Sequence, residues 1–485
     1  MKKLFLIITV LINFSGIAQD HLNDTTTVYK KRVLENAEID FLGSLYAQDG
    51  SNASVTGGIG TEKLSNITPT LVISVPLNDD DILSIDAGIS AYTSASSSNL
   101  NPFTGASSGE GEEEDDDKNF NEEGVPITGS PWVESTGASK SDILTHATAT
   151  YSHSSDNRNN IWSGNLSFST EFDYTSFGFG GGFAKLFNEK NTELSLKGKI
   201  YIDQWSPEYP TELISYFEAG QNLNNGFFSG IDILDENGMA IDKNGTNAWK
   251  PFKPTGIDTK SRNSYSLSLS FSQIIGRNAQ FSVFLDIVQQ TGWLANPMQR
   301  IYFTDRPNYY IGNAANIPNY TSPSNTDVFR LADDIERLPD MRLKTPIGVR
   351  LNYYINEIIS LRTYYRYYTD DWGINSQTAS IEIPIKIANR FTIYPSYRYY
   401  TQTAANYFAP FNEHLTTEEF YTSDYDLSEL NSHQYGFGIS YTDIFTKGHI
   451  WKFRLKSIDL KYSHYKRSTG LNANIVSAGI KFIFE

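Results

Sequence analysis

Apolar side chains recur at every second position over many stretches of this chain. Between Ile347 and Ile355 the odd-numbered residues are apolar, and the residues between them are mostly small or polar. The segments 379–387 and 476–484 alternate in the same way. A period of two places the two sets of side chains on opposite faces of a β-strand. One face of each strand therefore suits lipid and the other suits water.

This alternation predicts about sixteen strands, each near the ~9–11 residues or more that a tilted strand needs to cross a membrane. The predicted strands cover residues 33–46, 66–76, 82–93, 143–153, 161–173, 176–187, 192–205, 261–275, 279–292, 343–355, 358–370, 376–387, 391–403, 432–445, 454–467 and 473–485.

The lengths of the connections provide a second, independent pattern. Connections after even-numbered strands are short, as at 188–191 and 276–278, whereas every long connection follows an odd-numbered strand. A barrel in the outer membrane has short periplasmic turns and long extracellular loops. We therefore predict an all-β fold over residues 33–485: a transmembrane antiparallel β-barrel of about 16 strands. The large external loops are expected at 94–142, 206–260, 293–342 and 404–431, and residues 207–223 are compatible with a short helix.

The N-terminus has the pattern of a secretory signal peptide. Lys2 and Lys3 precede an apolar run that extends to Phe14, and small residues end at Ala18. This pattern predicts a signal peptide at 1–18 that is cleaved between Ala18 and Gln19. Residues 19–32 would form a short periplasmic segment, and the predicted location is the outer membrane of a Gram-negative bacterium.

Composition narrows the class of protein further. The chain has no Cys, which excludes disulfides and Cys-ligated metal centres. Its formal net charge of −17 makes nucleic acid an improbable partner. After the signal peptide no apolar run approaches the ~18 residues of a transmembrane helix, yet the chain carries 30 Tyr and 29 Phe. An exported, aromatic-rich chain without such a run is typical of a membrane β-barrel.

Charged residues within the predicted strands identify the face toward the lumen. A charge that faces lipid at mid-depth costs ~2–4 kcal/mol, so these side chains are expected to point inward. The inward candidates are Arg350, Arg362, Tyr364, Arg366, Glu382, Lys386, Arg398, Tyr400, Asp459 and Lys461. They would form either a pore wall that binds an anionic solute or a structural ladder of ion pairs and hydrogen bonds.

Tyrosines near the predicted strand ends have two interpretations. They are Tyr353, Tyr354, Tyr364, Tyr365, Tyr367, Tyr368, Tyr399 and Tyr400. The favoured interpretation is an interfacial girdle, in which amphipathic rings lie at headgroup level. The alternative is a stacking surface for sugars.

The sequence offers little catalytic or metal-binding chemistry. It contains no H-E-x-x-H and no G-x-S-x-G motif, so we expect no enzyme. His414 and His433, in or beside an external loop, could meet Asp424 and Asp426, but the favoured interpretation is that they are exposed to solvent. No cofactor is predicted, and any Ca²⁺ binding would be weak. Its candidate ligands are Asp115, Asp116 and Asp117 in an acidic run of the 94–142 loop, together with Asp424 and Asp426.

Several longer segments resemble a known family. They are "VTGGIGTEKLSNITPTLVISVPL" (55–77), "TEFDYTSFGFGGGFAKLFNEKNTELSLKGKIYID" (170–203), "YPSYRYYTQTAANYFAP" (394–410), "YTSDYDLS" (421–428) and "YKRSTGLNANIVSAGIKF" (465–482). On these segments the chain is similar to DUF3570, an uncharacterised family of predicted exported proteins of Gram-negative bacteria. The resemblance implies an outer-membrane location more strongly than any activity.

The favoured hypothesis from sequence is a porin-like pore or substrate channel. The alternative is a plugged barrel that acts as a docking scaffold for an envelope or surface protein, and an outer-membrane enzyme comes third. The expected partners are outer-membrane lipids, an anionic small solute and an envelope protein.

Overall fold

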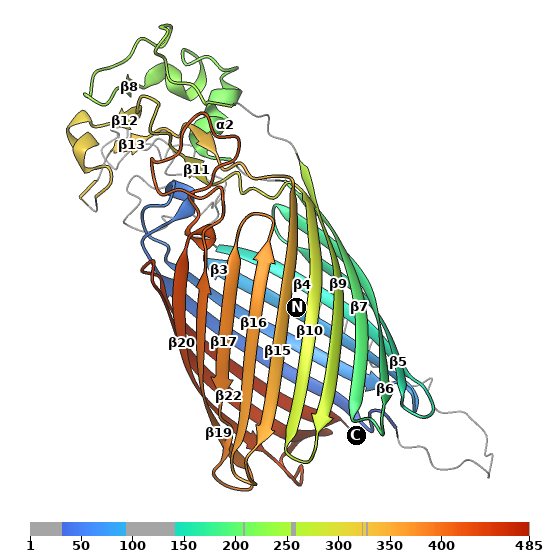
Figure 1. The fold of residues 1–485 in the computed structure, drawn as a ribbon. Coiled ribbons are helices and arrows are strands. Elements are labelled where there is room, and N and C mark those ends of the chain that lie inside the picture. Colours follow the sequence, from blue (N-terminus) through green and yellow to red (C-terminus); the bar gives the residue numbers. More distant parts are fainter. Residues whose placement is uncertain are drawn as a thin grey trace, which may run out of the picture.

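The protein is a closed antiparallel β-barrel of sixteen strands with a folded cap at one end (Figure 1). The computed structural model describes residues 32–93, 141–206, 209–253, 259–322, 324–325 and 328–484. The predicted signal peptide and its cleavage site at Ala18 and Gln19 lie outside these residues. Among the described residues, no helix is long and apolar enough to cross a membrane.

Consecutive strands pair along the whole wall, and the last pairs with the first to close it. The wall strands are β1 (Ala37–Asp49), β2 (Leu64–Pro76), β3 (Asp81–Thr93), β4 (Ser141–Ser154), β5 (Asn160–Thr170), β6 (Tyr174–Phe187), β7 (Thr192–Trp205), β9 (Lys260–Ile275), β10 (Ala279–Gly292), β15 (Met341–Tyr354), β16 (Ser360–Asp370), β17 (Asn375–Glu382) with β18 (Ile385–Lys386), β19 (Phe391–Gln402), β20 (Leu430–Thr442), β22 (Phe453–Arg467) and β23 (Asn472–Phe484). Closure runs from Ala37 opposite Phe484 to Asp49 opposite Asn472. The predicted fold class and strand number are confirmed.

One predicted strand differs in detail. Residues 376–387 form two pieces, β17 and β18, both of which pair with β19. The interruption falls at Pro384, which has no N–H to donate to the ladder. The barrel keeps its strand count because the two pieces occupy one place in the wall.

The apolar face of the strands is the outer surface of the barrel. Large side chains on this face are well exposed, including Phe41, Leu45, Ile67, Leu166, Phe179, Leu269, Ile287, Leu351, Tyr365, Phe437, Leu460 and Ile480. The other face is concave, since Lys461 on β22 reaches Glu382 on β17 across the two strands between them. The alternation of apolar and polar residues in the sequence therefore gives the barrel an apolar exterior and a polar lumen.

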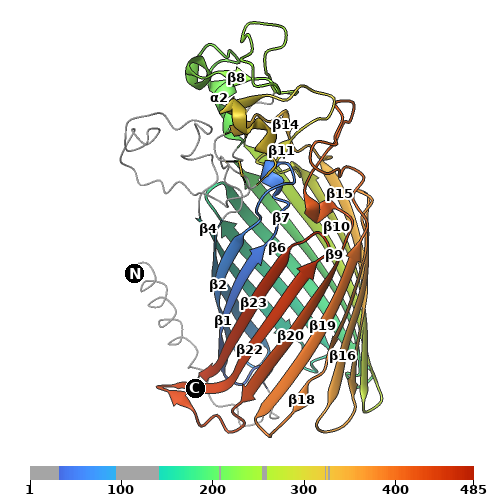
Figure 2. The same cartoon turned by 90° about the vertical axis from the view of Figure 1, so that its left-hand side faces the viewer.

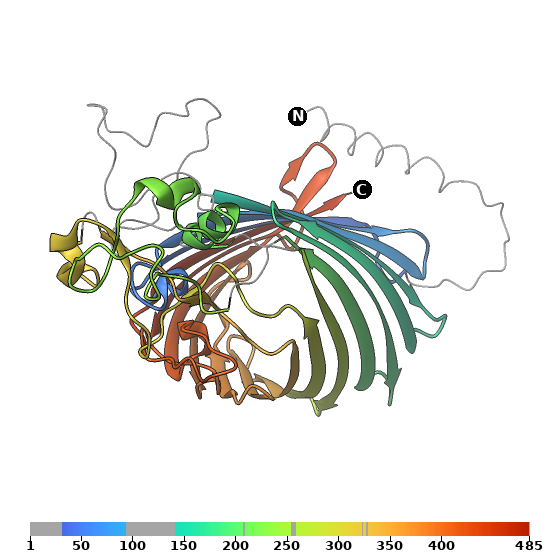
Figure 3. The same ribbon diagram turned by 90° about the horizontal axis from the view of Figure 1, so that it is seen from above.

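The hydrophobic core of the described residues lies largely in the long loops. The residues 50–63, 209–253, 293–340 and 403–429, here called the cap, gather at the end of the barrel opposite the short turns (Figures 1 and 2). Seen from above, the cap lies over one side of that end (Figure 3). The main cluster in the cap consists of Tyr209, Leu213, Tyr216, Leu223, Phe228, Ile233, Trp249, Tyr309, Ile311, Phe329, Leu331 and Ile335.

Short regular elements organise the cap. They are η1 (Ser54–Thr56), α2 (Thr211–Glu218), η2 (Gly226–Gly230), β8 (Ile233–Leu234), β11 (Arg300–Ile301), β12 (Tyr310–Gly312), η3 (Ala314–Asn319), β13 (Val328–Arg330), β14 (Asp334–Ile335) and η4 (Tyr425–Leu427). β8, β12 and β13 form one small sheet, and β11 pairs with β14. Both sheets join segments that are far apart in the sequence, so the long loops fold as one body.

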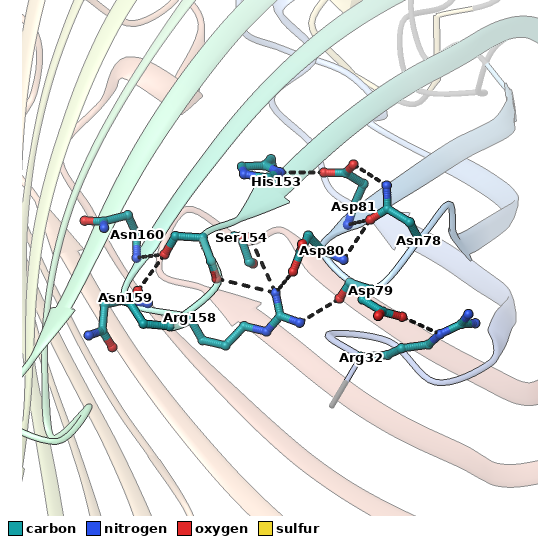
Figure 4. A network of polar contacts seen from close by, with 12 residues as sticks. Arg32, Asn78, Asp79, Asp80, Asp81, His153, Ser154, Arg158, Asn159 and Asn160 are labelled. Atoms are coloured by element: carbon teal, nitrogen blue, oxygen red, sulfur yellow. Dashed lines mark hydrogen bonds and ion pairs between the residues drawn. The ribbon is translucent and has the colours of Figure 1, made fainter. Parts of the chain in front are cut away.

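The opposite end of the barrel, the turn end, is held by a local polar network (Figure 4). Arg158 follows β4 and donates to the side chain of Asp80 and, at 2.8 Å, to the carbonyl of Asp79. Asp81 accepts from Asn78 at 2.6 Å and contacts the Nδ1 atom of His153 at 2.6 Å. One further short hairpin strand at this end, β21 (His449–Ile450), pairs with the start of β22. The network fixes neighbouring turns, which suits a rigid barrel base.

Candidate functional site: the inner wall of the barrel

The inner wall can be read directly from the strand register, because cross-strand partners share a face. One row runs from Arg350 through Tyr364 and Ser380 to Arg398. The next runs from Arg362 through Glu382 to Ser396, and another joins Arg366, Thr378 and Tyr400. Lys386, Asp459 and Lys461 continue these rows on β18 and β22. The structure therefore places the ten sequence-derived candidates on the concave face.

Glu382 is the centre of an ion-pair group on this wall. It accepts from Arg362 at 2.9 Å and from Lys461 at 3.2 Å. Lys461 can reach it because β20 carries Gly436 and Gly438 on the same face. A Cβ atom at Gly436 would lie 3.3 Å from Cε of Lys461, and one at Gly438 would collide with the ring of Tyr394. This part of the wall is a structural ladder, as one of the two interpretations expected.

Three arginines of the wall have no ion pair with a described acid. Among the described residues, Arg350 and Arg366 have only aromatic contacts, with guanidinium carbons 5.8 Å from the ring centres of Tyr364 and Tyr368. The buried Nε of Arg366 has no hydrogen-bond partner. Arg398 is exposed toward the lumen and also has no carboxylate partner in the described part of the chain. These guanidinium groups are available to a solute.

Several cations of the lumen were not among the candidates from sequence, and two of them show which signal was overlooked. Lys197 and Lys199 on β7 face inward beside Gly182 and Gly180 of β6. A Cβ atom at Gly180 would lie 2.9 Å from Cγ of Lys199, and one at Gly182 would lie 3.1 Å from Cγ of Lys197. The signal was present in "GFGGGF", where alternate glycines make room for long side chains on the next strand.

Positive side chains outnumber negative ones on the inner face of the described wall, although the whole chain has a net charge of −17. The inward cations include Lys197, Lys199, Arg262, Arg342, Lys344, Arg350, Arg362, Arg366, Lys386, Arg398, Lys456, Lys461, Arg467 and Lys481. The inward acids are Glu38, Asp40, Asp86, Glu193, Asp203, Asp286, Asp370, Glu382 and Asp459. Several of these acids are already paired, as Glu38 is with Lys456 and Lys481. The lumen is therefore a basic surface.

The predicted tyrosine girdle is only partly formed. Tyr353, Tyr365, Tyr367 and Tyr399 share the outer face with Val349 and Ile381. Tyr364, Tyr368 and Tyr400 lie on the inner face instead, where they alternate with the arginines, and Tyr354 follows the inner register at the end of β15. The interpretation of all eight as a girdle was wrong because consecutive tyrosines on one strand must point to opposite faces.

The candidate metal and catalytic residues are used by local structure. Asp424 accepts from the backbone N–H of Asp426 at 2.8 Å and so caps η4, while Asp426 pairs with Arg467 at 2.7 Å. Within the described ranges no three His, Asp or Glu residues cluster as a metal site would require. Asp115, Asp116 and Asp117 lie outside the described residues.

The two candidate histidines lie in different parts of the structure, His414 in the cap and His433 in β20. Nδ1 of His414 contacts Glu418 at 2.6 Å, and its Nε2 contacts the carbonyl of Thr422 at 3.0 Å. His433 lies on the outer face of β20 and contacts the hydroxyl of Tyr397 at 2.8 Å.

Comparison with solved structures returns barrels at low identity. OpdK of Pseudomonas aeruginosa, crystallised with vanillate, is 8% identical and has a TM-score of 0.34, with 93% of this chain and 99% of that chain covered. A variant of TodX, described as a monoaromatic hydrocarbon channel, is 10% identical with a TM-score of 0.36, and 93% and 91% are covered. A bacterial polysaccharide outer membrane secretin is 8% identical with a TM-score of 0.39, and 95% and 100% are covered.

No curated protein matches the sequence. The sequence model of one family does match, and it extends over residues 10–479. Its description is "Protein of unknown function (DUF3570)", and since the match spans nearly the whole chain, this protein belongs to that family.

Proposed function

We propose that this protein is a porin-like pore of the outer membrane that favours small anionic solutes. The observation that carries the proposal is the set of inward cations without an acidic partner in the described wall, above all Arg350, Arg366 and Arg398. Unpaired guanidinium groups attract anions strongly where low-dielectric walls focus the field. A purely structural ladder would pair its charges, as Glu382 does with Arg362 and Lys461.

The proposed location follows from the outer face of the barrel. A belt of exposed Leu, Ile and Phe would be unfavourable in water, whereas it matches the hydrocarbon core of a membrane. The long loops would face outward from the cell and the short turns would face the periplasm. This orientation agrees with the alternation of long and short connections along the sequence.

The cap supports one alternative function. The cap has a buried hydrophobic core, in which Trp249 is 1% exposed and Phe228 is fully buried. A loop that only covers the barrel mouth would not require such a core. This favours a docking scaffold for an envelope protein as the second candidate. We propose no catalytic role, because His414 and His433 are committed to structural contacts.

Ion selectivity in planar bilayers tests the proposal. The wild-type protein should conduct, and its reversal potential under a salt gradient should indicate a preference for anions. Arg350→Gln combined with Arg366→Gln should reduce this preference. Arg277→Gln, which removes an exposed cation in the turn between β9 and β10, is the control and should preserve it. A wild-type protein that stays closed at all voltages would reject the pore and favour the scaffold.

A further inference from the structure

The loop between β1 and β2 forms a fixed roof over part of the barrel mouth. Ala53 and Val55 are buried, and the carbonyl of Val55 accepts from Nη1 of Arg300 at 2.9 Å. Nδ2 of Asn52 donates to the carbonyl of Thr469 at 2.7 Å, which ties the loop to the turn between β22 and β23. The roof is therefore anchored to both the cap and the wall.

A cavity of about 440 Å³ lies between this roof and the inner wall. Its wall side follows one cross-strand row, in which Arg398 is opposite Gln434, and Gln434 is opposite Tyr465. The row continues through Ala473, whose small side chain leaves space, to Gln48. The volume falls within the ~300–1,000 Å³ typical of small-molecule sites, and it suits a solute of one or two sugar rings.

The polar groups of the cavity are of several kinds. Arg467 is neutralised by Asp426 at 2.7 Å, and its Nε contacts the hydroxyl of Tyr465 at 3.4 Å. The carboxylate of Glu62 accepts from the backbone N–H of Asn52 at 3.1 Å. The carboxylates of Glu62, Asp424 and Asp426 also line the cavity, and of its two arginines only Arg398 has no ion pair with a described acid. The other groups are amide, phenol and carboxylate groups that exchange hydrogen bonds with hydroxyls.

Aromatic rings complete the chemistry. Tyr46 on β1 and Tyr465 on β22 both line the cavity and flank β23. Rings of this kind can pack against the aliphatic face of a sugar, while polar groups at the rim fix its hydroxyls.

We propose that this cavity binds a sugar acid, with the carboxylate of the ligand on Arg398 and its ring beside Tyr46 and Tyr465. The inference rests on the proposed uptake of anionic solutes and names the class of solute that the mouth selects. A neutral sugar would leave Arg398 without a partner, and a small carboxylate such as acetate would leave the tyrosines and Gln434 unused.

Isothermal titration calorimetry on the full-length protein in detergent tests this site without requiring conduction. The probes are D-galacturonate, neutral D-galactose and acetate. Galacturonate should bind at least about tenfold more tightly than either of the other two, since charge-assisted hydrogen bonds to a guanidinium are strong. Arg398→Gln should abolish the preference for galacturonate over galactose. Arg277→Gln removes an exposed cation in the turn between β9 and β10, outside the cavity and the lumen wall, and should preserve it.

The outcomes separate this inference from the proposed pore. A protein that conducts anions yet binds the three probes equally would overturn the sugar-acid site and leave the pore intact. Binding of galacturonate by a protein that does not conduct would support the site and reject the pore. If Arg398→Gln does not fold, Arg398→Lys serves instead, and it should weaken galacturonate alone because lysine lacks the planar fork. Unchanged selectivity in that variant would also overturn the site.

Discussion

Glu336 should make the stability of the cap depend on pH. Its side chain is buried at 3% exposure and accepts from the backbone N–H of Asn296 at 2.6 Å. Burial raises its pKa to about 8, and the carboxylate of Asp424 adds to the effect. The pKa of Asp424 is itself raised to about 6, chiefly by burial and then by Asp426. These two carboxyl groups join the 293–340 and 403–429 loops, so their charge states bear on how firmly the cap is held.

The direction follows from proton linkage. The folded cap holds the proton of Glu336 more tightly than the unfolded chain, whose pKa is near 4.5. The stabilising contribution is therefore complete below pH 4.5 and is lost as the pH rises through about 8. A change from 4.5 to about 8 corresponds to about 4–5 kcal/mol of local unfolding free energy. This is a large share of the stability of any domain.

Hydrogen exchange of cap peptides between pH 5 and 9 measures this effect, with rates corrected for intrinsic exchange and barrel peptides as the reference. In the wild type, protection of residues 293–340 should fall steeply as the pH rises. Glu336→Gln keeps an acceptor for Asn296 but does not titrate, so most of the slope should disappear. Glu419→Gln, on the exposed surface of the same cap, should behave as wild type. An equal slope in Glu336→Gln and wild type would refute the role of Glu336.

Three other predictions concern the cap, the lumen and the membrane face. Arg300 and Glu212 form a two-point ion pair at 2.7 and 3.0 Å with both side chains almost fully buried, so Glu212→Leu alone should cost the cap about 3–5 kcal/mol in hydrogen exchange. The double change with Arg300→Met should recover much of that loss; no recovery would contradict the pairing. Gly180→Val should lower the melting temperature of the barrel, because its Cβ would lie 2.8 Å from the carbonyl of Gly198, whereas Gly181→Val on the outer face, with 3.4 Å to the nearest atom, should have little effect. Finally, Leu269→Arg on the outer face should lower the free energy of folding by ~2–4 kcal/mol in lipid-bilayer folding titrations. Ser268→Arg on the inner face should be tolerated. Equal losses in the two variants would contradict the assignment of faces.

Much of the barrel could be predicted because its signals are local. Period-two alternation in segments such as 343–355 assigns each residue to a face, and pairing of neighbouring strands converts that into rows of lumen side chains. This is why Arg350, Arg362 and Arg398 could be placed on the inner wall without knowledge of their contacts. The break at Pro384 was not predicted, although proline cannot donate to the ladder.

The cap and the mouth could not be predicted in this way. Tyr209, Trp249 and Phe329 have no common period, and they meet only because distant loops fold together. Arg300 finds its partners at Glu212 and at the carbonyl of Val55, far away in the sequence. Contacts between irregular segments carry no periodic signal. A high content of aromatic residues in long loops was the one available hint that these loops have a core of their own.

Arginines without an acidic partner in the described wall are proposed to make the lumen a pore for anions. The reversal potential of the wild-type protein in a planar bilayer, under a tenfold gradient of potassium chloride, tests this most directly. We predict a stable conductance. Its reversal potential should lie closer to the equilibrium potential of chloride than to that of potassium. A channel that stays closed, or a reversal potential closer to the equilibrium potential of potassium, would rule out an anion-selective pore.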